Sequence, residues 1–160
     1  MKLWRSSMLA LTFLAVGLTA PSAGAKEGDR SRLSVTVSFG AGRNTTGMAN
    51  HQILPPDIRV QTGGVVNFDV AGFHQIFVYL PGKTPDDVVV PDTGQFIDDT
   101  DQLYYEGINP SGEPPPGFSN TQNRVESVAF PDPGTYLVIC NVRTHFLNRM
   151  YAFVTVEDRQ

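Results

Sequence analysis

An eleven-residue segment near the end of the chain most constrains what this sequence can fold into. It begins with the single cysteine, Cys140, and continues to His145 and Met150, with four residues between each and the next. The apolar run from Thr135 to Cys140 and the segment from Tyr151 to Val156 are both predicted to be strands. A loop between two such strands brings a thiol, an imidazole and a thioether to one end of a sheet, where they can close round a single ion.

The chain opens with the pattern of a secretory signal peptide, residues 1–25. A basic start precedes an apolar run from Met8 to Leu18, and a small-x-small cleavage pattern ends at Ala25. The apolar run is shorter than the roughly 20 residues that cross a bilayer. We therefore expect cleavage after Ala25, export to the periplasm or beyond the cell, no stable membrane insertion, and one mature domain, residues 26–160.

The expected mature chain is acidic. Removal of Lys2 and Arg5 with the signal leaves ten basic residues against sixteen acidic ones, a net charge of −6. Nothing in the chain resembles a basic stripe or a basic amphipathic helix, so we expect no nucleic-acid partner. Six aspartates and no basic residue fall between residues 86 and 101. This acidic stretch either steers a positively charged partner or is a solvated loop.

A lone cysteine is unusual in an exported chain, because cysteines in an oxidising compartment normally pair. With one cysteine no internal disulfide can form. The thiol is then part of an intermolecular pair, a reactive group, an inert buried residue or a metal ligand. The neighbouring His145 and Met150 favour the metal ligand.

Most of the mature chain is predicted to be β-strand. Apolar and polar residues alternate from Leu33 to Phe39, which is typical of a half-buried strand. Ile58–Val60 and Val65–Phe68 flank Gly63-Gly64, a pattern that predicts a hairpin. No amphipathic helix of normal length and no internal repeat is found. The remaining strands are expected at residues 73–80, 125–130, 135–140 and 151–156.

About seven or eight strands with short turns predict an all-β fold, a two-sheet antiparallel sandwich with Greek-key connections. The stretch from Pro81 to Asn123 is different, because turn residues and acids dominate it. It includes Pro114-Pro115-Pro116, which cannot form a regular strand or helix. We expect a long loop-rich surface insertion here, with one or two short elements.

A second imidazole must come from outside the ligand loop, and His74, near the start of an apolar strand, is the best candidate. One thiolate, two imidazoles and a weak axial thioether form the ligand set of a blue-copper electron-transfer site. Zinc is the natural rival, but methionine is a poor zinc ligand, which favours copper. His51 and Met48 are reserve ligands, for which we expect structural or exposed roles.

These segments resemble the cupredoxins, the small type 1 blue-copper proteins, over most of the mature chain. Pro133 to Cys140 resembles the family's approach to its cysteine, and the segment from there to Val156 resembles its ligand loop and last strand. Gly72-Phe73-His74 resembles the region of its first histidine. The resemblance implies one mononuclear copper ion, with His74, Cys140 and His145 as trigonal ligands and Met150 as the axial one.

The chain departs from the family pattern at three places. Phe73 stands where the family often has asparagine, and Arg149 stands where it often has glycine. The proline common in the family's ligand loop is absent. Such changes alter the contacts behind the ligands, which tune ligand orientation and redox potential.

The resemblance implies a soluble electron carrier rather than an enzyme, a monomer that meets larger redox proteins by transient contact. A copper-binding protein for periplasmic delivery or storage is the alternative, although only Met48 and Met150 remain in the expected mature chain. Enzymatic functions fit less well. The chain has no His-x-His pair of a multicopper oxidase and no second cysteine for a binuclear copper centre. No third residue is evident that would orient His145 as the base of a Cys140 nucleophile.

Overall fold

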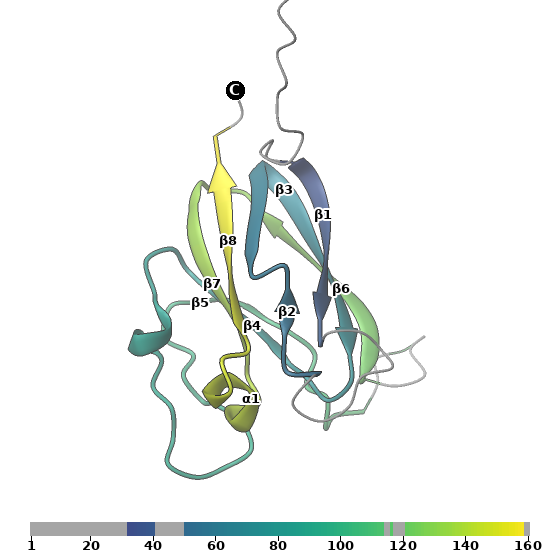
Figure 1. The fold of residues 1–160 in the computed structure, drawn as a ribbon, viewed down its shortest axis with the longest axis vertical. Helices are drawn as coiled ribbons and strands as arrows, with labels where there is room; N and C mark the ends of the chain where they lie inside the picture. The colour runs from purple at the N-terminus through teal and green to yellow at the C-terminus, as the bar shows by residue number, and fades with distance from the viewer. Residues whose placement is uncertain (1–31, 41–49, 114–115, 117–120, 159–160) are drawn as a thin grey trace, which may run out of the picture.

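A computed structural model describes residues 32–40, 50–113, 116 and 121–158 (Figure 1). The predicted signal peptide, residues 1–25, and the reserve ligand Met48 lie outside these residues. Within them, no helix is both long enough and apolar enough to cross a membrane.

The described part of the chain is built almost entirely from strands. One short helix, α1 (Arg143–Leu147), and one 3-10 turn, η2 (Pro85–Asp87), interrupt them. The strands are β1 (Arg32–Phe39), β2 (Ile53–Leu54), β3 (Asp57–Ala71), β4 (Ile76–Tyr79), β5 (Leu103–Glu106), β6 (Asn123–Phe130), β7 (Gly134–Cys140) and β8 (Tyr151–Glu157).

The strands lie in two layers that share one long strand, β3 (Figure 1). Residues 57–61 of β3 pair with β8, and that layer continues through β7 and β4 to β5. Residues 64–71 pair with β6 on one side and with β1 on the other, and β1 also pairs with β2. The all-β sandwich is confirmed, with most neighbouring strands antiparallel. The pairs β1–β3 and β3–β8 are parallel.

The predicted hairpin around Gly63-Gly64 is wrong, because both of its arms belong to β3. The glycine pair lets the strand leave one layer for the other instead of reversing it. Gly63 has a φ of 79°, in the left-handed region that favours glycine. A Cβ on Gly64 would lie 2.7 Å from the main-chain oxygen of Gln61, so this position has no room for a side chain.

The main core lies between the two layers. Its buried side chains come from strands of both, and β6 alternates buried and exposed residues over its full length. Such alternation is typical of a strand with one face on the core and one face toward solvent. Residues of this core with no exposed surface include Val37, Phe68, Phe130, Val138 and Val154.

A second apolar cluster covers the outer face of β4 and β7. Phe77 and Ile139 belong to it, together with Val88 and Ile97 of the loop-rich insertion and Phe146 of α1. The strand β7 is therefore buried on both faces, which explains why its sequence does not alternate. The insertion contains η2 and β5, as expected, but part of it packs onto the sheet instead of lying free on the surface.

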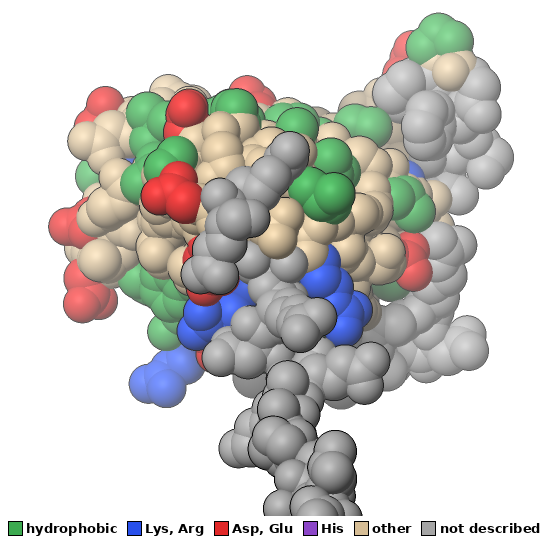
Figure 2. Space-filling view, turned by 90° about the horizontal axis from the view of Figure 1, so that it is seen from above, with side chains coloured by type: hydrophobic (Ala, Val, Ile, Leu, Met, Phe, Trp, Pro, Cys, Tyr) green, Lys and Arg blue, Asp and Glu red, His purple; other side chains and the backbone are tan. Residues whose placement is uncertain are grey.

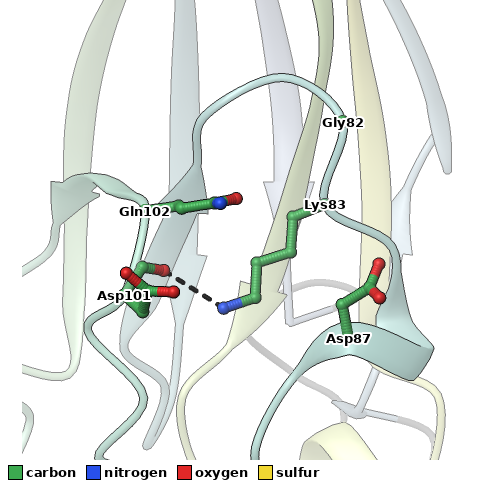
Figure 3. A pocket seen from close by; sticks show the side chains of 5 residues that line it. All are labelled: Gly82, Lys83, Asp87, Asp101 and Gln102. Atoms are coloured by element: carbon green, nitrogen blue, oxygen red, sulfur yellow. Dashed lines mark hydrogen bonds between the residues drawn. The ribbon is translucent and has the colours of Figure 1, made fainter.

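Lys83 anchors the beginning of this insertion. Its Nζ donates to Oδ2 of Asp99 at 2.7 Å and to the main-chain oxygen of Asp101 at 3.1 Å, and it lies 4.3 Å from the ring centre of Tyr79. Figure 3 shows the Lys83 side chain reaching toward Asp101. Lys83 also lines a hollow of about 260 Å³ together with Gly82, Asp87, Asp101 and Gln102. These contacts hold the Lys83 amine in place at the beginning of the insertion.

Candidate metal centre

Three of the four predicted ligands meet at the α1 end of the sandwich. The Nδ1 atoms of His74 and His145 each lie 3.5 Å from Sγ of Cys140, and they lie 3.0 Å from each other. Among the described residues, these three form a group that could hold a metal ion. The centre of this triangle is roughly 2 Å from each atom, close to the length of a metal–nitrogen bond.

Each predicted ligand comes from a different part of the fold. His74 lies in the turn between β3 and β4, Cys140 ends β7, His145 lies in α1, and Met150 immediately precedes β8. The expected strand 73–80 begins only at Ile76, so His74 lies before the strand and not within it. A turn residue can direct its ring toward the end of the sandwich without taking part in the strand ladder.

Main-chain hydrogen bonds fold the ligand loop back on itself. The N–H of Cys140 donates to the oxygen of Met150 at 3.0 Å, and the N–H of Met150 donates to the oxygen of His145 at 3.0 Å. Met150 has no exposed surface and belongs to the same apolar cluster as Cys140. The fold therefore buries the thioether residue beside the thiol residue, and its role as axial ligand stays a prediction.

The helix α1 has no counterpart among the predicted elements. Its five residues are too few to give an amphipathic pattern. Phe146 is buried in the outer apolar cluster, while the adjacent His145 reaches the thiol of Cys140. The helix thus fastens the ligand loop to the outer face of the sheet at the point where the loop supplies its imidazole.

Burial determines the protonation of the three converging groups. Burial lowers the pKa of His74 to about 3, with a further contribution from the nearby His145, and it lowers the pKa of His145 to about 4. Burial also raises the pKa of the Cys140 thiol to about 12. Both imidazoles are neutral at pH 7, the form that binds a metal. The thiol must lose its proton to bind, and a metal cation favours that loss.

A buried ion pair supports the main chain of His74. Arg124 donates from Nη2 to the main-chain oxygen of His74 at 3.0 Å and from Nε to Oε1 of Glu126 at 2.6 Å. Oε2 of Glu126 accepts a hydrogen bond from the hydroxyl of Tyr105 at 2.7 Å. Arg124 and Glu126 are 3% and 4% exposed.

Sequence reasoning did not single out this ion pair, although the sequence carries a signal for it. Val128 and Phe130 face the core, so the period of two along β6 places Arg124 and Glu126 on the same face. Two opposite charges on the buried face of a strand are expected to pair with each other.

Two consecutive residues that precede β2 contact the imidazoles from the other side. Nδ2 of Asn50 lies 3.0 Å from Nε2 of His74. The ring of His51 stacks on the ring of His145, with centroids 3.7 Å apart and an interplanar angle of 27°. His51 is half-buried and is not one of the three grouped ligands, so its expected structural role becomes a specific contact with a predicted ligand.

The structure explains the departures at Phe73 and Arg149. Phe73 packs against the main core and lies near Phe96, with ring centroids 6.1 Å apart. Arg149 has a φ of 65°. Glycine adopts this left-handed conformation without strain, whereas other residues rarely adopt it. At Arg149 the chain therefore combines a backbone conformation that favours glycine with a charged side chain.

Among the described residues, the other end of the sandwich holds no comparable group of possible metal ligands. Figure 2 views that end, and no histidine is visible on the described surface there. Acidic side chains are scattered around this face between polar and apolar ones. The candidate centre is thus confined to the end that carries α1.

No family model matches this chain, and no curated protein sequence matches it. Among solved structures, it is similar to dithionite-reduced auracyanin from the photosynthetic bacterium Roseiflexus castenholzii, at 17% identity and a TM-score of 0.49, over 79% of this chain and 98% of that one. It is also similar to auracyanin A, a "blue" copper protein from the green thermophilic photosynthetic bacterium Chloroflexus aurantiacus, at 18% identity and a TM-score of 0.45, over 78% of this chain and 99% of that one. Oxidised plastocyanin from Dryopteris crassirhizoma matches at 18% identity and a TM-score of 0.42, over 77% of this chain and 100% of that one.

Proposed function

We propose that this protein is a blue-copper electron carrier, in which one bound copper ion accepts and donates single electrons between Cu(I) and Cu(II). One observation carries the proposal: a thiol sulfur and two imidazole nitrogens from three separate elements lie within 3.5 Å of one another. In this proposal His74, Cys140 and His145 are the trigonal ligands, and Met150 is the axial ligand.

The donor set favours copper over zinc. A thiolate and a thioether are soft donors that suit Cu(I), and imidazole suits both oxidation states. A structural zinc site usually takes four ligands from cysteine, histidine and carboxylate. No carboxylate among the described residues joins the group, while Met150 is buried in the same cluster as Cys140.

The protein frame also supports electron transfer. His74 and Cys140 have no exposed surface, and hydrogen bonds hold the main chain at both residues and at Met150. Ligands held in this way change position little between two oxidation states, which keeps the cost of exchanging an electron low. Burial argues against delivery or storage, because ligand exchange with another protein requires access to the donors.

Export and partner contact belong to the same proposal. Residues 1–25 carry the pattern of a signal peptide, which supports export to the periplasm or beyond the cell. His145 is half-buried and Leu147 is 54% exposed, so the ligand loop reaches the surface. We propose that the monomer meets larger redox proteins there by small, transient contacts.

The test is to add Cu(II) to the purified protein and record its visible absorption and electron spin resonance. An intense visible band that disappears in Cys140→Ser would establish thiolate-to-copper charge transfer. Repeated chemical reduction and reoxidation should then bleach and restore the band without loss of copper. A colourless protein that prefers zinc would contradict the proposal, and release of copper on the first reduction would favour delivery or storage.

A further inference from the structure

Asn50 and His51 contact the two imidazoles of the candidate centre: Asn50 lies at the outer nitrogen of His74, and His51 stacks on His145. We infer that these two residues form a clamp that fixes the orientation of both rings, an inference that rests on the proposed metal centre. The clamp residues are positioning residues, since they act through His74 and His145. They lie more than twenty residues before the first predicted ligand, and the sequence predicts only a structural or exposed role for His51, with a reserve role as ligand.

The first half of the clamp is a hydrogen bond to the outer nitrogen of His74. Nδ1 of this ring faces Sγ of Cys140 at 3.5 Å, and Nε2 lies 3.0 Å from Nδ2 of Asn50. The same amide donates to the main-chain oxygen of Ala71 at 3.0 Å, at the end of β3. Both ring nitrogens therefore have a neighbour, and the amide is itself tied to the sheet. A ring held at both nitrogens cannot turn without losing one contact.

The chemistry of a ligating imidazole requires a group at this place. When Nδ1 of His74 binds a metal, the ring proton resides on Nε2 and needs an acceptor. The side chain of Asn50 carries such an acceptor in Oδ1, and a half-turn of the amide would bring it to the ring in exchange for the hydrogen bond to Ala71. An aspartate at this position would keep an acceptor, whereas a leucine of similar size would not.

Local backbone geometry makes room for this contact. Gly72 has a φ of 98°, and a Cβ built on it would lie 2.8 Å from Nδ2 of Asn50. A side chain at Gly72 would therefore push the amide away from His74. Phe73, the residue before His74, packs near Phe96. Asn50 reaches His74 from a segment 24 positions earlier in the chain.

The second half of the clamp is a stack on His145. The ring of His51 lies over it at a centroid distance of 3.7 Å and meets the ring of His74 edge-on, with centroids 6.1 Å apart. Nδ1 of His51 is buried, and no described residue hydrogen-bonds to it. The ring is thus positioned by its faces and edges, as expected for aromatic contacts. A phenylalanine should therefore replace it, and an alanine should not.

Four variants test the clamp in pairs. Asn50→Leu and His51→Ala remove the two contacts. Asn50→Asp keeps an acceptor for the ring proton of His74, and His51→Phe keeps the stack on His145. In the Cu(II)-loaded protein, Asn50→Leu and His51→Ala are each expected to shift the visible band and the spin-resonance splitting. Both variants should also release copper to a chelator about 10 to 100 times faster than the wild type. The second pair should keep the wild-type spectrum and release rate. Gln52→Ala is the matched control, because Gln52 is exposed in the same segment and no hydrogen bond is described between its side chain and either ring.

A second measurement does not depend on copper. Carbon relaxation at the ring atoms of His74 and His145 in the metal-free protein should show rings as rigid as the backbone, with His145 becoming mobile in His51→Ala but not in His51→Phe. Freely mobile wild-type rings would overturn the clamp even if a variant failed to fold. If copper gives no thiolate band while the rings are rigid, the proposed function fails and the clamp stands. A normal band, with spectra, release rates and ring mobility unchanged in all variants, would contradict the clamp and leave the proposed function standing.

Discussion

Arg124 donates a hydrogen bond from its guanidinium to the main-chain oxygen of His74, 3.0 Å away, although the two residues are 50 positions apart in the chain. The same guanidinium bonds Glu126 and the main-chain oxygens of Ile108 and Thr121. An arginine remains charged wherever it lies, so its burial requires all of these partners. One buried cation on β6 therefore stabilises the fold and holds the first predicted ligand in place.

Removal of this cation is expected to be costly. Arg124→Met would leave the carboxylate of Glu126 buried without its cation, and loss of one partner of a buried pair typically costs about 3–5 kcal/mol. The double variant Arg124→Met/Glu126→Leu should recover much of that loss. Denaturant unfolding of the metal-free protein measures both. The matched control is Arg59→Met, which breaks an exposed pair with Glu157 and should cost less than about 1 kcal/mol. Equal losses for Arg124→Met and Arg59→Met would contradict this account.

The metal-free protein is expected to lose stability on acidification. The pKa of each of His74 and His145 is near 6.5 in the unfolded chain and falls to about 3 and about 4 on folding, because both rings are buried. Between these values and 6.5, the unfolded chain binds protons that the folded protein does not bind. Falling pH in this window therefore favours unfolding. Denaturant unfolding at a series of pH values measures the slope, which His145→Gln should make shallower. A slope unaffected by His145→Gln would rule out this origin.

Alkaline pH should also weaken the metal-free fold, through Cys140. Burial raises the pKa of its thiol from 9 to about 12. Between these values the unfolded chain loses a proton that the folded protein keeps, so rising pH favours unfolding. The same unfolding series extended to alkaline pH checks this, with Cys140→Ala as the control that should remove the effect. An alkaline slope that persists in Cys140→Ala must come from another group, such as a tyrosine.

Met150 should govern the potential of the copper-loaded protein more than the stability of the fold. Met150→Leu keeps the buried volume, and such exchanges usually cost less than about 1.5 kcal/mol. Loss of the weak axial thioether would leave three ligands, a coordination number that Cu(I) accepts more readily than Cu(II), so the potential should rise by about 59 mV for each tenfold change in relative affinity. Met150→Gln offers a harder oxygen donor and should lower it. Voltammetry gives both values, and a potential identical in all three proteins would show that Met150 is not a ligand.

Arg149→Gly is expected to stabilise the protein. A non-glycine residue in the left-handed region costs roughly 1–2 kcal/mol, and Arg149 has a φ of 65°. Part of the gain is offset by the greater freedom of glycine in the unfolded chain. Arg149→Ala removes the same side chain but keeps the strain, so it separates the effect of conformation from that of charge. Thermal unfolding should rank glycine above arginine and alanine; an alanine variant as stable as the glycine variant would assign the gain to the lost charge.

The sequence was a good guide to local features of the centre. Cys140, His145 and Met150 could be predicted together because they share one short loop between two strands. His74 could be added because an apolar segment follows it. The contacts of Asn50, His51 and Arg124 could not be predicted in this way, since each joins segments far apart in the chain and depends on how the two layers meet.

The error at Gly63-Gly64 has a related cause. A glycine pair between two apolar runs is compatible with a reversal of the chain and with a strand that changes layers, and local pattern does not distinguish them. Strand pairing determines which of the two structures forms. The first half of β3 pairs with β8, and the second half pairs with β6 and β1. The five-residue helix α1 was missed because it has too few residues to show a helical period, and its stability comes from packing on the sheet.

The passage of β3 through both layers also limits how the molecule can move. The layers cannot slide past each other or separate unless β3 gives up its pairing with β8 or with β6. Cys140 belongs to the first layer, while Arg124, which supports His74, belongs to the second. Any relative shift of the layers would separate Arg124 from the ligand that it holds. A continuous strand between the layers therefore makes the two halves of the sandwich a single mechanical unit, so that the distances within the centre are maintained by covalent connection as well as by packing.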